Sequence, residues 1–168
     1  RQGGFWDLGK KLWAYVPAAL ATPRNEPLLR SHALERGWAH LTWPSVGGVV
    51  RNHGFGDVDL LYCDSPKHLS WLSHVARART VFRVADNTSG FGRTTPAARS
   101  AERELAAAAD LVVYSAETLK EYVEGLKPRR MAHLPNGVNF SHFARPDVPV
   151  PSEYASIRRP IAVYAGYM

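Results

Sequence analysis

Small polar and acidic side chains follow four short apolar runs of the sequence, each at the point where a run ends. They are Asp64-Ser65, Asp86-Asn87, Ser115 and Asn136-Gly137. If the runs are parallel strands, their carboxyl ends meet at one edge of a sheet, and open α/β sheets bind their ligands at that edge. These residues are therefore the candidate site.

Asp86 is the candidate catalytic residue of this set. A carboxylate at the tip of a buried strand, close in sequence to Arg83 and to the glycine-containing residues 88–92, can take a proton from an attacking hydroxyl. The alternative is that Asp86 only caps its turn through its side chain, which is a common use of aspartate. Both interpretations stay open from the residues alone.

Alternating strand and helix patterns must position these residues. Apolar and β-branched runs bounded by turn residues predict strands at residues 59–63, 80–84, 111–114 and 130–134. Helices are predicted between the strands at residues 67–78, 97–109 and 116–124. Ser115 is expected to cap the last of them. This alternation predicts an α/β fold, a Rossmann-like parallel sheet with flanking helices.

The two ends of the chain have weaker patterns. Near the start, we expect a strand at residues 12–16, a helix at 26–37 and a short connection at 47–52. Toward the end, four prolines between residues 139 and 160 indicate a linker, after which residues 161–166 resemble a new strand that turns into a glycine. The predicted organisation is a partial acceptor-side domain at 1–140, a linker at 141–160 and the first strand of a second domain at 161–168, with both chain ends cut.

Composition limits the partners. The chain has 168 residues, and 21 Lys and Arg against 15 Asp and Glu give a net charge of +6, which favours an anionic partner. The basic residues are dispersed among the predicted elements instead of forming one stripe, so we expect no nucleic acid partner. The single cysteine, Cys63, excludes a disulfide framework, and the seven scattered histidines predict no metal site.

The location of the protein is predicted from its apolar runs. No run approaches the roughly 20 residues that span a bilayer, and no secretory signal is visible, so we expect a cytoplasmic protein. Phe5-Trp6 and residues 10–13 combine aromatic and basic side chains, as a segment lying on a membrane does. Peripheral contact with the inner face of the membrane is therefore a second prediction; the alternative is an ordinary strand edge or solvated helix.

Two parts of the sequence carry a resemblance to a known family. Residues 109–115, then Leu134 to Phe140 with Asn136-Gly137, and then the proline-bearing linker into residues 162–166 resemble the domain junction of GT-B glycosyltransferases. Residues 82–86 with 101–105 are similar to the acceptor domain of the xanthan-type membrane-associated glucuronosyltransferases. Asn139 is a departure, since many such enzymes have an acidic residue there. The resemblance covers the chain from about residue 57 to its end.

The resemblance implies the N-terminal half of a GT-B two-domain architecture. Such an enzyme moves a sugar from a nucleoside diphosphate donor to a hydroxyl of a lipid-linked or polysaccharide acceptor, with no metal and no further cofactor. Asp86 would then be the general base of an inverting reaction, or would only bind acceptor if the chain follows the retaining branch. The implied substrate-binding residues are Arg83, Asn87, Ser115, Asn136, Gly137 and Gly166.

Other interpretations stay open. Gly166 would let the donor diphosphate approach closely, although a plain turn is the commoner role of such a glycine. A non-catalytic α/β nucleotide- or sugar-binding module would keep the same fold without needing an acid at the strand end. These 168 residues are expected to be inactive by themselves, because most donor contacts would lie in a second domain.

Overall fold

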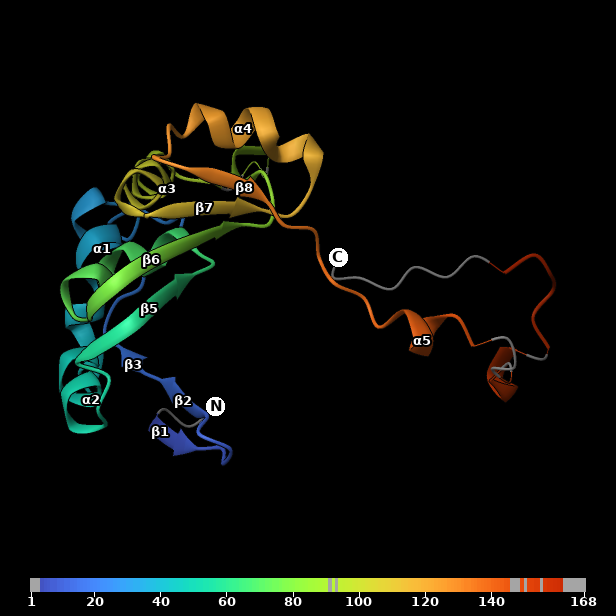
Figure 1. The fold of residues 1–168 in the computed structure, drawn as a ribbon, viewed down its shortest axis with the longest axis horizontal. Helices are drawn as coiled ribbons and strands as arrows, with labels where there is room; N and C mark the ends of the chain where they lie inside the picture. The colour runs from blue at the N-terminus through green and yellow to red at the C-terminus, as the bar shows by residue number, and fades with distance from the viewer. Residues whose placement is uncertain are drawn as a thin grey trace. The chain divides into compact units, whose positions relative to one another are not determined.

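The structure, a computed structural model, describes residues 4–90, 92, 94–145, 149, 151–154 and 156–161. The chain divides into two compact units, Arg1–Asn136 and Gly137–Met168, and each is described by itself. The first unit holds a parallel sheet with helices packed against it (Figure 1). The predicted domain boundaries after residues 140 and 160 stay predictions, and residues 162–166 of the predicted last strand lie outside the described residues.

Four parallel strands form the sheet, and their spatial order follows the chain. They are β5 (Asp57–Cys63), β6 (Ala76–Val84), β7 (Leu111–Tyr114) and β8 (Met131–His133). In the register, Cys63 lies beside Phe82, which lies beside Val112. The predicted α/β fold with a parallel sheet and flanking helices is therefore confirmed, and the arrangement is consistent with a Rossmann-like sheet.

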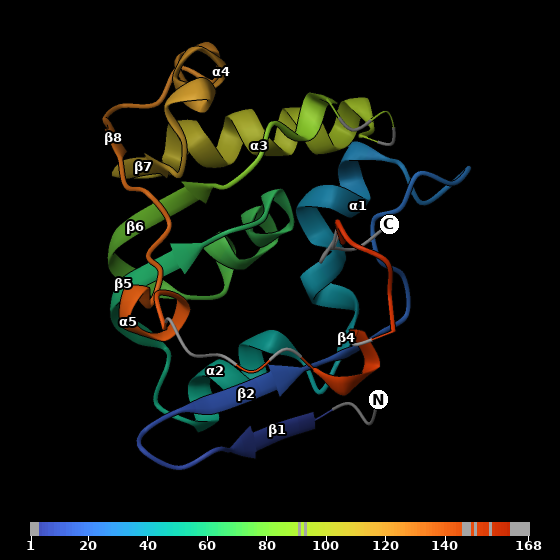
Figure 2. The same ribbon diagram turned by 90° about the vertical axis from the view of Figure 1, so that its right-hand side faces the viewer.

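The helices between the strands pack on one face of the sheet (Figure 2). They are the 3₁₀ helix η2 (Pro66–Ser73), α3 (Pro96–Ala108), and the short η4 (Glu117–Leu119), which continues into α4 (Lys120–Gly125). Each strand is added at the same edge, and because crossovers between parallel strands are right-handed, every connection falls on the same side. Phe82, Leu105 and Val123 are fully buried in the resulting core.

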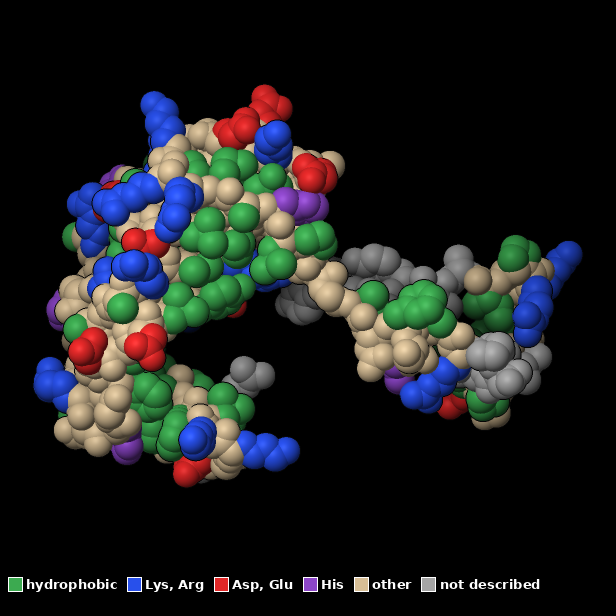
Figure 3. Space-filling view, in the orientation of Figure 1, with side chains coloured by type: hydrophobic (Ala, Val, Ile, Leu, Met, Phe, Trp, Pro, Cys, Tyr) green, Lys and Arg blue, Asp and Glu red, His purple; other side chains and the backbone are tan. Residues whose placement is uncertain are grey.

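The opposite face of the sheet is covered by no described helix of the first unit. Side chains alternate along a strand, so the register places Tyr62, Val81 and Leu111 together on this face. Leu60 and Tyr62 are 52% and 50% exposed. Figure 3 looks onto this face and shows hydrophobic side chains gathered over the strands. Parallel sheets are usually covered on both faces, so this apolar surface is unusual.

The N-terminal part of the first unit packs beside this sheet. It holds the antiparallel pair β1 (Gly4–Asp7) and β2 (Trp13–Val16), the pair β3 (Ala18–Ala19) and β4 (Thr42–Trp43), α1 (His32–Gly37), η1 (Trp38–Leu41) and α2 (Val46–Asn52). Val46 and Val50 of α2 are buried against Ala39 and Val75. Among the described residues, no helix is long and apolar enough to cross a bilayer.

The predictions for residues 26–37, 47–52 and 67–78 were wrong. The helix predicted at 26–37 begins only at His32, because Leu28 has a φ of 72°, in the left-handed region that no right-handed helix contains. The connection predicted at 47–52 is helix α2, whose N–H group at Gly48 donates to the hydroxyl of Ser45. The helix predicted at 67–78 ends at Ser73, because β6 begins earlier than expected and pairs Ala76 with Asp57.

The second unit is short. Its elements are α5 (Phe140–Phe143) and the 3₁₀ turn η5 (Ser152–Tyr154). The side chain of Asn139 caps α5 by accepting a hydrogen bond of 3.0 Å from the N–H group of His142. The residue at which the resemblance departs from its family therefore has a local structural role as a helix cap.

Candidate functional site

The candidate site begins at the end of β6, where the backbone leaves the sheet. Asp86 is exposed there and lines a small cavity of about 110 Å³. Arg83, Thr88 and Asp64, the last at the end of the neighbouring strand β5, line the same cavity. The structure thus places three carboxylates, those of Asp64, Asp86 and Glu102, and one guanidinium around one hollow at the carboxyl edge of the sheet, where parallel α/β sheets bind ligands.

Arg83 is joined to the end of strand β8. Its guanidinium donates to the amide oxygen of Asn136 across 2.6 Å, although the two residues are 53 positions apart in the chain. Because the amide is neutral, this bond itself does not neutralise the positive charge of Arg83. Of the residues implied to bind substrate, Arg83 and Asn136 are therefore brought into direct contact.

Ser115 does not form the predicted helix cap. Its hydroxyl donates to the carbonyl oxygen of Ala85 at 3.0 Å, and its N–H group donates to Val84 at 3.2 Å. The helix that follows begins after Ala116, which provides no side-chain cap. The predicted helix cap at Ser115 was wrong because the strand end of β6 lies within its reach. Ser115 instead fixes the backbone immediately before Asp86.

Asn87 lines a different cavity from that of Asp86. This larger cavity, of about 410 Å³, lies between α3 and α4. Arg99 and Arg103 of α3 and Tyr122 of α4 contribute to its wall. Asp86 and Asn87 are neighbours in sequence, yet each contributes to a separate hollow.

A buried polar network supports the loop that carries Asp86. The carboxylate of Glu102 is 2% exposed and its Oε2 atom accepts from Thr88 at 2.8 Å and from Tyr122 at 2.6 Å. Burial, followed by this bond to Glu102, raises the pKa of the Tyr122 phenol above its usual value. The network ties residue 88 to both α3 and α4, and so limits the positions that the loop can take.

Sequence reasoning gave none of these three residues a role in the site. The available signal was the position of Glu102 on α3, three and four residues before the buried Leu105 and Ala106. A charged side chain on the core-facing stripe of a helix needs partners, because an unpaired buried charge is costly. Its partners, Thr88 and Tyr122, lie 14 and 20 positions away and have no local pattern that identifies them.

The roles implied for Gly137 and Gly166 stay predictions. Gly137 is the first residue of the second unit, and Gly166 lies outside the described residues. In the part of the chain that the structure describes, no three His, Cys, Asp or Glu side chains are grouped so as to hold a metal ion.

The chain was also compared with known proteins. Neither the models of protein families, nor the curated proteins, nor the solved structures gave a match to it. The geometry at the strand ends is therefore the main support for a function.

Proposed function

We propose that the protein is a glycosyltransferase of the GT-B class, and that its first unit is the acceptor side of that architecture. The observation that carries the proposal is the position of Asp86. It is an exposed carboxylate at the carboxyl end of a central parallel strand, and it lines a hollow together with Arg83. The junction sequence around Asn136-Gly137 adds the resemblance described above.

In the proposed reaction, Asp86 acts as a general base. Its carboxylate takes the proton of an acceptor hydroxyl while the hydroxyl oxygen attacks the anomeric carbon of the donor sugar. The bond from that carbon to the donor diphosphate breaks, and a nucleoside diphosphate leaves. Attack from the opposite side inverts the anomeric carbon. If the product keeps the donor's configuration, Asp86 serves only to bind the acceptor.

The neighbouring residues would assist by position and charge. Ser115 fixes the backbone at Ala85, and the Glu102 network fixes Thr88, so Asp86 is held from both sides. Arg83, whose partner is a neutral amide, can attract an anionic part of a substrate. A general base held in this manner contributes about a 100-fold to 10,000-fold rate increase.

A sugar- or nucleotide-binding module without catalysis is the second candidate. It is favoured by the cavity between α3 and α4, which is larger than the one at Asp86 and has Arg99 and Arg103 in its wall. This candidate predicts ligand binding that does not depend on Asp86. Loss of the Asp86 carboxylate should therefore abolish function in a glycosyltransferase and leave ligand binding unchanged in a binding module.

The test measures sugar transfer by a longer protein that includes the proposed donor-binding domain, as wild type and as its Asp86→Asn and Asp64→Asn variants. Labelled nucleoside diphosphate sugars are offered with lipid-linked and glycan acceptors. We expect Asp86→Asn to lower kcat by at least about 100-fold. Asp64→Asn is the matched control, because it removes a carboxylate from the same cavity, and we expect less than about a tenfold loss. Normal transfer by Asp86→Asn would remove the catalytic assignment, and sugar binding without transfer by the wild type would favour the binding module.

The proposal includes peripheral contact with a membrane through the β1–β2 hairpin. Leu8 and Leu12 are each 59% exposed on the turn of this hairpin, on either side of Lys10 and Lys11. Exposed apolar side chains beside lysines suit an anionic lipid surface. The fraction of protein that cosediments with anionic vesicles should fall for the double variant Leu8→Ser/Leu12→Ser. The control Leu20→Ser changes another exposed leucine and should leave this fraction unchanged.

A further inference from the structure

A third cavity lies where α1, η2 and α3 meet, and we call it the α1 cavity. Its volume is about 230 Å³. Two helix N-termini form part of its wall: Ser65, Pro66 and Lys67 begin η2, and Thr95 and Ala98 begin α3. The N-terminus of a helix has a partial positive charge, and two that face one cavity favour an anion there.

Full positive charges add to those of the helix ends. Arg24 and Lys67 both line the α1 cavity, together with the amide of Asn25. Ser65 and Thr95 already cap their helices, since their hydroxyls accept from Lys67 and Ala98 at 3.4 and 3.1 Å. The helix ends therefore act mainly through their electrostatic field, and the side chains of Arg24 and Lys67 provide the direct donors.

Glu35 gives the α1 cavity an independent feature. It lines the cavity, is 4% exposed, and its Oε2 atom has no hydrogen-bond partner among the residues that the structure describes. Burial raises the pKa of this carboxyl, while the nearby charge of Lys67 opposes the rise. A buried oxygen without a partner has lost the hydrogen bonds that it makes in water, so a ligand hydroxyl that donates to it would recover stability.

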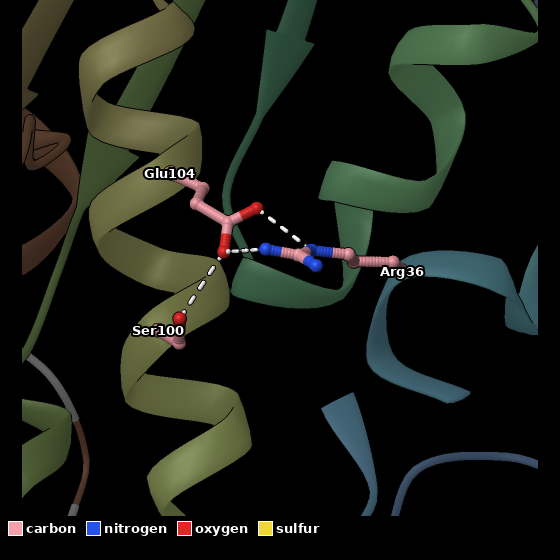
Figure 4. A network of polar contacts seen from close by, with 3 residues as sticks. All are labelled: Arg36, Ser100 and Glu104. Carbon is pink, nitrogen blue, oxygen red and sulfur yellow. Dashed lines mark hydrogen bonds and ion pairs between the residues drawn. The ribbon is translucent and has the colours of Figure 1, made fainter. Parts of the chain in front are cut away.

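The wall that carries Glu35 is held in place from two sides. The guanidinium of Arg36 binds the carboxylate of Glu104 in α3 through bonds of 2.9 and 2.6 Å, and Ser100 supports the same carboxylate (Figure 4). The indole of Trp38 donates to the carbonyl oxygen of Lys67 at 2.9 Å. The α1 cavity is thus preformed, which lowers the entropic cost of binding.

The α1 cavity adjoins the cavity of Asp86. Pro66 and Thr88 line both of them, so a ligand held in one lies next to the other. We propose that the α1 cavity binds an anionic sugar, with its charged group beside Arg24 and Lys67 and one hydroxyl donating to Glu35. This assignment rests on the proposed function: the bound sugar is the acceptor, and a second hydroxyl of this sugar is directed toward Asp86.

Calorimetric titration of the full chain tests the α1 cavity. The probes are glucose 6-phosphate, galacturonate, glucose and inorganic phosphate. The first two carry their negative charge on a phosphate and on a carboxylate, glucose lacks the charge, and inorganic phosphate lacks the sugar. We expect a charged sugar to bind at least about tenfold more tightly than glucose or phosphate alone. Preference for the phosphate or for the carboxylate identifies the source of the charge.

Variants separate binding from folding. Glu35→Leu removes the oxygen without a partner and keeps a similar volume, so we expect the Tm to stay or rise while binding of the charged sugar weakens by about tenfold. Glu35→Gln, which keeps one oxygen acceptor, should bind with intermediate affinity. Lys67→Met should abolish the preference for charged probes, whereas Lys120→Met, at an exposed position on α4, should not.

Two results would overturn the α1 cavity as a sugar site. One is equal affinity for glucose and both charged sugars, and the other is unchanged binding by Glu35→Leu. Either result, found together with Asp86-dependent transfer, would leave the proposed function intact. If the protein binds a charged sugar at the α1 cavity but transfers no sugar, the cavity is still a sugar site, but it is not the acceptor site of a transferase.

Discussion

The phenol of Tyr122 in α4 donates to the carboxylate of Glu102 in α3 across 2.6 Å, beneath the loop that carries Asp86. Thr88, two residues beyond Asp86, donates to the same carboxylate oxygen at 2.8 Å. Two helices and the loop therefore meet at one buried atom. Because Glu102 is almost completely excluded from water, each of these bonds replaces solvation that the carboxylate lost on folding.

Removal of the Tyr122 hydroxyl should destabilise the protein. We expect Tyr122→Phe to lower the free energy of unfolding by about 1 to 2 kcal/mol, because Glu102 loses one of its two hydroxyl donors while buried. Urea unfolding measures the change. Tyr62→Phe is the matched control, since Tyr62 is half exposed on β5 and should change stability little. Equal stability of both variants would contradict a structural role for the network.

Cys63 should be unreactive in the folded protein. It is completely buried, and burial raises the pKa of its thiol to about 11, so the reactive thiolate is scarce at neutral pH. We expect an aromatic disulfide reagent to react at least about 100-fold faster after unfolding in denaturant than before it. The chain has one cysteine, so the signal has a single source. Rapid reaction of the native protein would show that β5 is not packed as described.

The ion pair between Arg36 and Glu104 should make stability depend on acid pH. The hydrogen bond from Arg36 lowers the pKa of Glu104 below its ordinary value of 4.5. A lowered carboxyl pKa stabilises the folded state above the unfolded pKa, and the gain is lost as pH falls through the folded value. Wild type should therefore exceed Glu104→Gln in Tm at neutral pH, and the difference should shrink as the pH falls below 4.5 and through the lowered pKa of Glu104.

This pH effect should be small and sensitive to salt. Arg36 and Glu104 are both partly exposed, and solvent and dissolved ions screen exposed pairs. Added salt should therefore reduce the difference between wild type and Glu104→Gln at neutral pH. A difference that grows as the pH falls would mean that Arg36 does not stabilise the ionised carboxylate.

Leu105 should be among the costliest positions to truncate. It is completely buried in the cluster beneath the sheet, together with Phe82 and Val112. We expect Leu105→Ala to lower the free energy of unfolding by about 2 to 5 kcal/mol, through lost burial and the cavity that remains. Leu20→Ala makes the same change at a residue that is 91% exposed, and thermal unfolding should show little effect there.

The sheet could be predicted from the sequence because its signals are local. Each apolar run is short and ends at turn residues, and the strand Leu111–Tyr114 has the predicted bounds. Helix α2 was missed because Gly47 and Gly48 are poor helix formers. Its burial against Ala39 and Val75 overrides that local preference. The available signal was the spacing of Val46, Val49 and Val50, which stand at i, i+3 and i+4.

The candidate site could be predicted only in part. The location of Asp86 at a strand end followed from the apolar run before it. The bond between Arg83 and Asn136, and the convergence of Thr88 and Tyr122 on Glu102, join residues far apart in the chain. Such contacts depend on the register of the sheet and on helix packing, which no short segment encodes.

The sequential order of the strands also affects how the chain can fold during synthesis. The sheet grows only at one edge, so β6 pairs with β5, β7 with β6 and β8 with β7. Each strand therefore leaves the ribosome after its partner has already been made, and each pairing joins residues that are 19 or 30 positions apart. Loops of this length cost less entropy to close than pairings between distant parts of a chain. The sheet can thus assemble in the direction of translation, without waiting for a distant part of the chain.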